Sequence, residues 1–243
     1  MVRICILLSG RIKQYKGLLN MIKKSKDNID VFASINDVDS EFYDNFRNDF
    51  RGYLRGIHFE LYKIPSFFYT NCNYNRRLGN KFPNVLSCYY NNMIVLRMAT
   101  LYADTNNFEY DIYLRFRSDI EADTLPIFDD RYKKGMLFCG RPPVDRFKLA
   151  VTDDPTLEFK DGREYCMGDI KNLDAEITAD IAYGNRNAML IYCSCYDYIL
   201  RENQKYKGNY LIWFENCITM CINDSNYPFE LFEYEYKYTD NRF

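Results

Sequence analysis

The segment from residue 111 to residue 121 carries the side chains best suited to chemistry. It reads Asp-Ile-Tyr-Leu-Arg-Phe-Arg-Ser-Asp-Ile-Glu, so apolar and charged residues alternate along much of it. Because successive side chains of a β-strand point to opposite faces, we expect a strand with one apolar and one charged face. The apolar face holds Ile112, Leu114, Phe116 and Ile120, interrupted by Ser118; the charged face holds Asp111, Tyr113, Arg115, Arg117 and Asp119, and Glu121 if the chain stays extended.

The charged face of this strand is unusual, because strands inside a mostly parallel sheet are usually apolar on both faces. Buried arginines pair with carboxylates or with a phosphate. One explanation is a structural network in which Asp111 pairs with Arg115 and Arg117 pairs with an acid elsewhere in the chain. The other is a ligand crevice, which in open α/β sheets lies at the carboxyl ends of the strands.

Asp119 and Glu121 lie at the carboxyl end of the expected strand, where two carboxylates can share one hard cation. Mg²⁺ and Mn²⁺ take oxygen ligands, and they commonly bind through one or two carboxylates together with substrate phosphates. Arg115 or Arg117 could add bidentate contacts to a phosphate. The pattern therefore predicts a site for Mn²⁺ or Mg²⁺ and a diphosphate.

The elements that must position this segment begin with two short apolar runs joined by a helix. The runs, residues 3–8 and 30–35, have the composition of buried parallel strands. Between them, Ile12, Tyr15 and Leu19 begin an apolar repeat of helical spacing. A strand-helix-strand unit implies a right-handed crossover and a parallel sheet.

The rest of the chain continues this α/β pattern, without an internal repeat or a linker. We therefore expect one α/β domain over residues 1–243, with a mostly parallel central sheet flanked by helices. Strands are expected at 57–64 and 135–139, and a helix with Tyr90, Ile94, Met98, Leu101 and Tyr102 on one face. Further helices are expected over 174–201, with an interruption near Gly184-Asn185, and over 210–223, and an edge strand or packed arm at 229–238.

Composition excludes several other classes of protein. The formal net charge is −2, which counts against a general nucleic-acid binder. The single histidine, His58, lies in an alternating strand pattern, and no serine-hydrolase or zinc-protease motif is present. None of the nine cysteines forms a CxxC motif, so no zinc site is expected. The apolar run Ile4–Leu8 is too short for a signal peptide or a membrane span, which predicts a cytoplasmic protein without a membrane span.

Three stretches of the chain resemble GT-A-type glycosyltransferases of bacterial capsule and lipopolysaccharide synthesis, with relatives in large DNA viruses. The middle stretch is similar to the family's "YD, apolar, R-x-R-x-D" block, which stands in the place of the D-x-D metal motif. The three stretches are the opening strand with Ser9-Gly10-Arg11 and Asp30-Val-Phe32, the helix running into Tyr110-Asp-Ile-Tyr-Leu-Arg-Phe-Arg-Ser-Asp119, and Asp180-Ile-Ala-Tyr-Gly184 with Met189 and Trp213-Phe-Glu215.

The resemblance implies a hexosyl- or pentosyltransferase of polysaccharide biosynthesis, with a nucleotide-sugar donor, a glycan or glycoconjugate acceptor, and Mn²⁺ or Mg²⁺. By position, Ser9, Gly10 and Arg11 would contact the nucleotide. Asp119, with Glu121, would hold the metal, although this chain has D-x-E where the family has D-x-D.

The resemblance also divides the chain into a nucleotide-binding half, about 1–121, and an acceptor-side half, about 122–243. An inverting transferase needs a carboxylate to deprotonate the acceptor hydroxyl. Asp169, Asp180 and Glu215 are the candidates for this base, and a retaining enzyme would need none of them.

Two alternatives stay open at the level of sequence. The chain could be a catalytically inactive glycan-binding or structural protein on the same fold, which the imperfect metal motif favours. It could also be a metal-dependent nuclease, because the segment 153–160 contains an E-x-K pattern after two aspartates. The acidic, turn-rich surroundings of that segment count against the nuclease.

Overall fold

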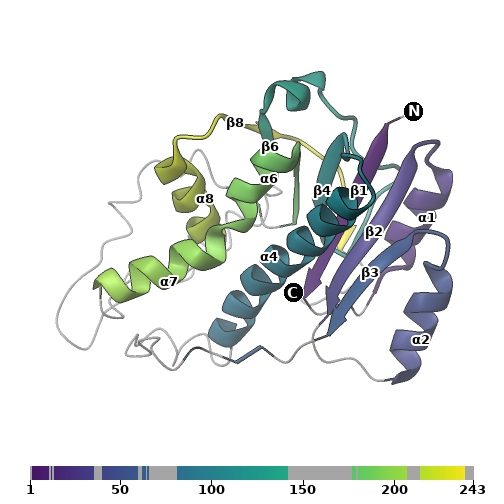
Figure 1. The fold of residues 1–243 in the computed structure, drawn as a ribbon, viewed down its shortest axis with the longest axis horizontal. Helices are drawn as coiled ribbons and strands as arrows, with labels where there is room; N and C mark the ends of the chain where they lie inside the picture. The colour runs from purple at the N-terminus through teal and green to yellow at the C-terminus, as the bar shows by residue number, and fades with distance from the viewer. Residues whose placement is uncertain are drawn as a thin grey trace.

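A seven-stranded mixed sheet forms the centre of the computed structural model (Figure 1). The structure describes residues 2–10, 12, 14–35, 40–59, 62, 63, 65, 81–141, 177, 178, 180–206 and 214–238. The strand order is β3-β2-β1-β4-β7-β6-β8, and β7 alone among these strands runs antiparallel to its neighbours. The strands are β1 (Arg3–Gly10), β2 (Asn28–Ile35), β3 (Leu54–Phe59), β4 (Ile112–Phe116), β6 (Leu137–Gly140), β7 (Ile181–Gly184) and β8 (Phe229–Phe232).

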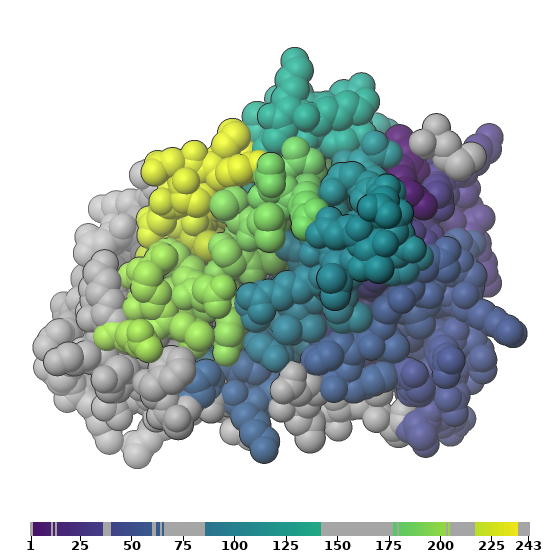
Figure 2. Space-filling model, in the orientation of Figure 1, coloured from purple at the N-terminus to yellow at the C-terminus, as the bar shows by residue number. Residues whose placement is uncertain are grey.

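Helices cover both faces of the sheet, as the predicted mostly parallel α/β architecture requires. The four helices α4, α6, α7 and α8 lie on the side that faces the viewer in Figure 1, and α1 and α2 pack on the other side. In the same orientation, Figure 2 shows α4, α6 and α7 hiding most of the sheet. The helices are α1 (Lys16–Lys24), α2 (Ser40–Asp49), α4 (Lys81–Thr105), α6 (Arg186–Cys193), α7 (Cys195–Tyr206) and α8 (Phe214–Ser225), with a 3-10 turn η1 at Asp130–Lys134.

The opening strand-helix-strand unit forms as the apolar pattern predicts. Residues 4–8 of β1 and 29–35 of β2 are buried, and the two strands pair in parallel over their whole length. Helix α1 begins at Lys16 rather than near Ile12, and it buries Leu18, Leu19, Met21 and Ile22 against the sheet. Its last turn carries two lysines, and positive charges there interact favourably with the negative end of the helix dipole.

The alternation predicted for segment 111–121 is correct along β4. Ile112, Leu114 and Phe116 lie in the core on the α1 side of the sheet, whereas Tyr113 lies in the core under α4. The strand ends at Phe116, and a turn separates it from the two-residue strand β5 (Ile120–Glu121). Asp119 and Glu121 therefore do not continue one extended face.

Two sequence expectations for the helices were wrong. The buried face of α4 is offset from the predicted one: Leu101 is 67% exposed, whereas Tyr89, Leu96 and Ala99 are buried. The apolar residues of α4 itself are spread around its circumference, so their spacing alone does not indicate which face is buried. Within the expected helix 174–201, residues 181–184 form β7, and its four buried residues join the sheet before α6 and α7 begin.

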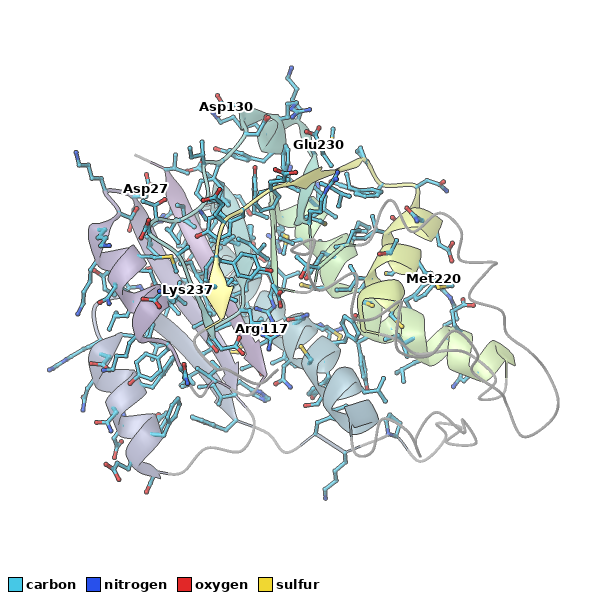
Figure 3. The ribbon with its side chains drawn as sticks, turned by 180° about the vertical axis from the view of Figure 1, so that it is seen from behind. Asp27, Arg117, Asp130, Met220, Glu230 and Lys237 are labelled. Atoms are coloured by element: carbon cyan, nitrogen blue, oxygen red, sulfur yellow. The ribbon has the colours of Figure 1, made fainter. Side chains whose placement is uncertain are left out.

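The carboxyl-terminal segment is both an edge strand and an arm. β8 pairs in parallel with β6 at the end of the sheet, and the chain then returns to pair its strand β9 (Lys237–Tyr238) with β5. Seen from behind in Figure 3, the segment crosses the face of the sheet between Glu230 and Lys237. No helix in the described part of the chain is long and apolar enough to cross a membrane.

Candidate active site at the carboxyl ends of the central strands

Arg117 binds two carboxylates directly after β4. Its Nε and Nη2 atoms donate to the two oxygens of Asp119 at 2.6 and 2.9 Å, and its Nη1 atom donates to Oδ1 of Asp180 at 3.0 Å. The backbone N–H of Arg117 also donates to the carbonyl of Asp180, at 2.8 Å. The turn after β4 and the start of β7 therefore bring one arginine and two aspartates together at the edge of the sheet where α/β proteins bind ligands.

The carboxyl-terminal arm supports this cluster from one side. The hydroxyl of Tyr236 donates to Oδ2 of Asp180 at 2.7 Å. Next to it, Lys237 in β9 lies 3.6 Å from the Glu121 carboxylate in β5. Figure 3 shows the β9 end of the arm beside Arg117. Asp180 is almost fully buried, so the arm and Arg117 together stabilise a carboxylate that would otherwise be costly to bury.

A second polar group lies under helix α4, behind the end of β1. Oδ1 of Asn92 accepts hydrogen bonds from the Ser9 hydroxyl at 2.5 Å and from Nε of Arg115 at 2.8 Å. Arg115 is 2% exposed and Asn92 is 1% exposed. Nη1 of Arg115 and Nδ2 of Asn92 are buried without a hydrogen-bond partner. No described carboxylate pairs with Arg115, so the network expected between Asp111 and Arg115 does not form; the carboxylate of Asp111 accepts from the backbone N–H of Arg3 instead.

The adjacent strand repeats the serine-asparagine contact. Ser34 in β2 is the register partner of Ser9, and its hydroxyl donates to Oδ1 of Asn91 at 2.5 Å. The ring Nδ1 of His58 in β3 lies 3.1 Å from the same hydroxyl. A belt of polar side chains thus crosses the sheet beneath α4, close to the carboxyl ends of its strands, in an interface that is otherwise apolar.

Burial dominates the electrostatics around Arg115. It raises the pKa of the Tyr192 hydroxyl, and it raises the pKa of the Cys193 thiol to about 12, while the positive charge of Arg115 acts in the opposite direction on both groups. The Tyr192 hydroxyl is also buried without a hydrogen-bond partner. These three side chains therefore lie together in a poorly solvated interior, where electrostatic interactions are strong.

The end of β1 has the backbone that a close ligand approach requires. Gly10 has a φ of 91°, in the left-handed region that favours glycine. Apart from the chain neighbours of Gly10, no atom of the described residues lies within 4 Å of a Cβ atom built on this glycine. Ser9 is half-buried, and Arg11 lies outside the described residues.

A cavity of about 610 Å³ lies on the α1 side of the sheet, between the segment that follows β5 and the carboxyl-terminal arm. Aromatic rings line it, among them Phe138 and Tyr183, which stack with their centroids 4.8 Å apart. The Tyr234 hydroxyl closes one side by donating to the carbonyl of Thr124 at 2.5 Å. Its carboxylates are Asp123, Asp129, Glu230, Glu233 and Glu235, and no lysine or arginine is among the described residues that line it.

The structure brings together only part of the predicted site. Asp180 joins Asp119 through Arg117, whereas Asp169 lies outside the described residues. Glu215 lies in the first turn of α8, but its side chain is outside the described set. Sequence reasoning missed Asn92 and Tyr236. A polar pair, Asn91-Asn92, in the middle of an apolar helix was the signal that could have found the first of them.

The carboxylates fit a hard cation in their chemistry, although not as a complete protein cage. No group of three or more potential ligands gathers among the described histidine, cysteine, aspartate and glutamate residues. The side chain of Asp119 is 25% exposed, and both of its oxygens now accept from Arg117. Asp119 would have to exchange at least one of these hydrogen bonds for a cation to serve as one oxygen ligand, with phosphate oxygens completing the shell, as is common for Mg²⁺. Glu121 contacts Lys237 and lies against α1 at Gly17.

Similarity to solved structures identifies the fold. The chain aligns with core-mannan synthase A of Aspergillus fumigatus, in its Mn/GDP form, with a TM-score of 0.55 and 10% identity, over 96% of this chain and 73% of that one. The apo form of the glycosyltransferase GlyE of Streptococcus pneumoniae aligns with a TM-score of 0.45 and 10% identity, over 95% of this chain and 45% of that one. The first alignment confirms the predicted GT-A-like fold, and at this identity it establishes the fold alone.

Sequence comparison adds no family assignment. No protein-family model matches the chain, and no curated protein matches it by sequence.

Proposed function

We propose that this chain is a glycosyltransferase that transfers a sugar from a nucleotide-diphosphate donor to a glycan acceptor, with the help of Mn²⁺ or Mg²⁺. One observation carries the proposal: the Asp119–Arg117–Asp180 cluster directly follows β4 at the carboxyl edge of a GT-A-like sheet. The aligned core-mannan synthase is in a Mn/GDP form, which supports a divalent cation and a nucleoside diphosphate here as well.

Arg117 and Asp119 would act on the diphosphate. Breaking the bond between the sugar and the diphosphate leaves negative charge on the departing phosphate oxygen, and preorganised positive groups lower the energy of that state. Arg117 is 39% exposed, and its fork of donors can bind phosphate oxygens bidentately. Asp119, with Glu121 as the second expected ligand, would hold the cation, which supplies further charge stabilisation to the leaving diphosphate.

Of the three candidate bases, Asp180 is the one whose contact with Arg117 is described. Its two oxygens accept from Arg117 and from Tyr236, so both are occupied. We assign Asp180 the role of holding Arg117 in place, because its hydrogen bonds join Arg117 to the carboxyl-terminal arm. Asp169 and Glu215 remain the predicted candidates for the base that takes the acceptor hydroxyl proton.

The aromatic and acidic cavity supports a glycan acceptor. Carboxylates accept hydrogen bonds from sugar hydroxyls, and aromatic faces pack against apolar faces of sugar rings. Every residue that lines the cavity lies between 122 and 235, within the expected acceptor-side half. The described lining residues include five carboxylates and no cation, a set that suits a neutral sugar better than the anionic donor.

Further parts of the proposal follow from the sequence resemblance. They are a single glycosyltransferase domain with a nucleotide-binding half about 1–121 and an acceptor-side half about 122–243, hexosyl or pentosyl transfer in polysaccharide biosynthesis, and a cytoplasmic location. The resemblance also suggests that the chain is related to glycosyltransferases of bacterial capsule and lipopolysaccharide synthesis and to their relatives in large DNA viruses.

Release of nucleoside diphosphate tests the proposal. Purified protein is incubated with Mn²⁺, a panel of nucleotide sugars and a mixture of oligosaccharide acceptors. One donor should release its diphosphate, and Asp119→Asn should abolish this release. Asp111→Asn is the matched control, because Asp111 lies at the opposite end of the same strand and contacts only backbone among the hydrogen bonds described for it. Equal release by wild type and Asp119→Asn would contradict the assigned role of Asp119.

A second candidate is a catalytically inactive glycan-binding protein on the same fold. The observation that favours it is the full engagement of Asp119 by Arg117, which leaves neither carboxylate oxygen unbonded in this structure. This candidate predicts oligosaccharide binding without release of nucleoside diphosphate from any donor, and the same incubation separates the two.

A further inference from the structure

The cavity beside the carboxyl-terminal arm has more carboxylates than the described cations around it can neutralise. Arg131 binds two of the five, Asp129 and Glu230. The other three are exposed and form no ion pair within the described part of the chain; they are Asp123, Glu233 and Glu235. A cleft lined by charges of one sign concentrates their field, so the cavity attracts positive groups.

Arg131 shows which kind of group this part of the protein binds. Its guanidinium donates hydrogen bonds to both Asp129 and Glu230, and its Cζ atom lies 5.5 Å from the centroid of the Phe138 ring. The same ring and the same two carboxylates also line the cavity, and Figure 3 shows Glu230 at the start of the arm. Carboxylates next to aromatic rings are a combination that binds organic cations.

The described lining of the cavity is also richer in hydrogen-bond acceptors than in donors. Carboxylates only accept, and no side-chain amide or cation is among the described lining residues. The hydroxyl hydrogen of Tyr234 is already used by the carbonyl of Thr124. A bound sugar therefore has to supply the donors, and a protonated amine supplies three of them with a positive charge, whereas a hydroxyl supplies one. The partly exposed rings of Phe232 and Tyr234 line the same space.

We propose that the cavity binds a glycan that carries a protonated amino group, and that this glycan is the acceptor. The inference rests on the proposed transfer reaction and refines it, because it specifies the charge of the acceptor. The two substrates then differ in sign: the anionic donor binds on the Arg117 side, and the cationic acceptor binds beside the arm. The volume of about 610 Å³ suits a ligand of this kind, since small-molecule sites enclose roughly 300–1,000 Å³.

Isothermal titration calorimetry on the full chain tests the proposal without a donor. The probes are three β-1,4-linked trisaccharides, of glucose, N-acetylglucosamine and glucosamine, which differ in the substituent at C2: a hydroxyl, an acetamide or an amine. At about pH 6 the amine and the carboxylates are both charged. The amino trisaccharide should bind roughly 5- to 30-fold more tightly than the other two. Raising the salt concentration from about 0.05 M to about 0.5 M should reduce this preference, because salt screens exposed charges.

Neutralising the three unpaired carboxylates should remove most of the preference. The variant is Asp123→Asn combined with Glu233→Gln and Glu235→Gln, and it should bind the donor's nucleoside diphosphate within about twofold of wild type. If the triple variant does not fold, each single substitution should still lower the affinity for the amino trisaccharide by about 1.5- to 5-fold. Asp130→Asn is the matched control for the single variants, because it removes an exposed charge from η1, outside the described lining of the cavity.

Equal binding of the three trisaccharides by wild type, or a preference that survives in the triple variant, would overturn this inference alone. Tighter binding of trilysine than of the amino trisaccharide would also overturn it, because the cavity would then be a peptide site. A wild type that shows the expected preference and loses it in the triple variant, yet releases no nucleoside diphosphate from any donor, would support the amino-glycan site and contradict the proposed transfer reaction.

Discussion

Replacing Arg117 by methionine tests whether the contact with Asp180 organises the candidate site. Nη1 of Arg117 donates to Oδ1 of Asp180 at 3.0 Å, and the side chain of Asp180 is 2% exposed. Methionine keeps a side chain of similar length but removes the charge. Asp180 would then keep the hydrogen bond from Tyr236 and lose this cation.

The size of the effect follows from burial. Removing one partner of a buried ion pair costs about 3–5 kcal/mol. The side chain of Arg117 is 39% exposed, so solvent screens part of the interaction and we expect about 2 kcal/mol. In a domain of this size that lowers Tm by about 4–8 °C. Asp180→Asn removes the buried charge itself and keeps an acceptor for Tyr236, so the double variant should be more stable than Arg117→Met alone.

Urea unfolding of the four proteins measures this coupling as a double-mutant cycle. Arg131 provides a control of matched geometry, because it also binds an aspartate two residues away, Asp129, and an acid from a distant strand, Glu230. Those two carboxylates are 40% and 45% exposed, so the equivalent cycle should show almost no coupling. Effects of Arg117→Met and Asp180→Asn that add within about 0.5 kcal/mol would refute the reasoning.

Three other predictions concern the frame of the site. Tyr236→Phe should lower the free energy of unfolding by about 1 kcal/mol through its lost bond to Asp180, and unchanged urea unfolding would count against a role for the arm. Gly140→Ala should lower the free energy of unfolding by about 1–3 kcal/mol, because the new Cβ would collide with Cγ2 of Ile181 in the adjacent strand. A melting temperature equal to that of wild type would show that β6 and β7 pack less closely than this. Burial raises the pKa of the Cys193 thiol from about 9 to about 12, so its contribution to the free energy of unfolding is complete below pH 9 and is lost as the pH rises toward 12. The destabilisation caused by Cys193→Ala should therefore shrink between pH 9 and pH 12. A difference in unfolding free energy between the two proteins that stays constant over this range would contradict the prediction.

The fold was largely predictable because its decisive signals are local. The apolar runs of β1 and β2, the helical repeat between them and the alternation along β4 are each set by a few adjacent residues. Together they specify a parallel strand-helix-strand unit and the edge of the sheet at which charged residues gather. The antiparallel strand β7 was missed because its four residues are apolar and directly precede a helix, a context in which length and period do not separate strand from helix.

The candidate site was only partly predictable because its contacts join distant segments. Arg117 and Asp119 are two residues apart, but their partner Asp180 directly precedes β7, 63 residues beyond Arg117, and the Tyr236 that supports it comes from the arm. A sequence motif cannot show that a turn after Phe116 separates Asp119 from Glu121. Arg115 appeared suited to phosphate on the basis of charge alone, yet α4 buries it against Asn92.

The most direct test of the account is a binding panel of UDP, GDP, CDP and dTDP, each with and without Mn²⁺, followed by thermal shift on wild type and Asp119→Ala. A ligand at 100 times its Kd stabilises the folded state by about 2.7 kcal/mol, which raises Tm by several degrees. The account predicts that one nucleotide stabilises wild type in the presence of Mn²⁺, and that Asp119→Ala, folded but unresponsive to Mn²⁺, loses this shift. No shift with any nucleotide, or an equal Mn²⁺-dependent shift in both proteins, would contradict it.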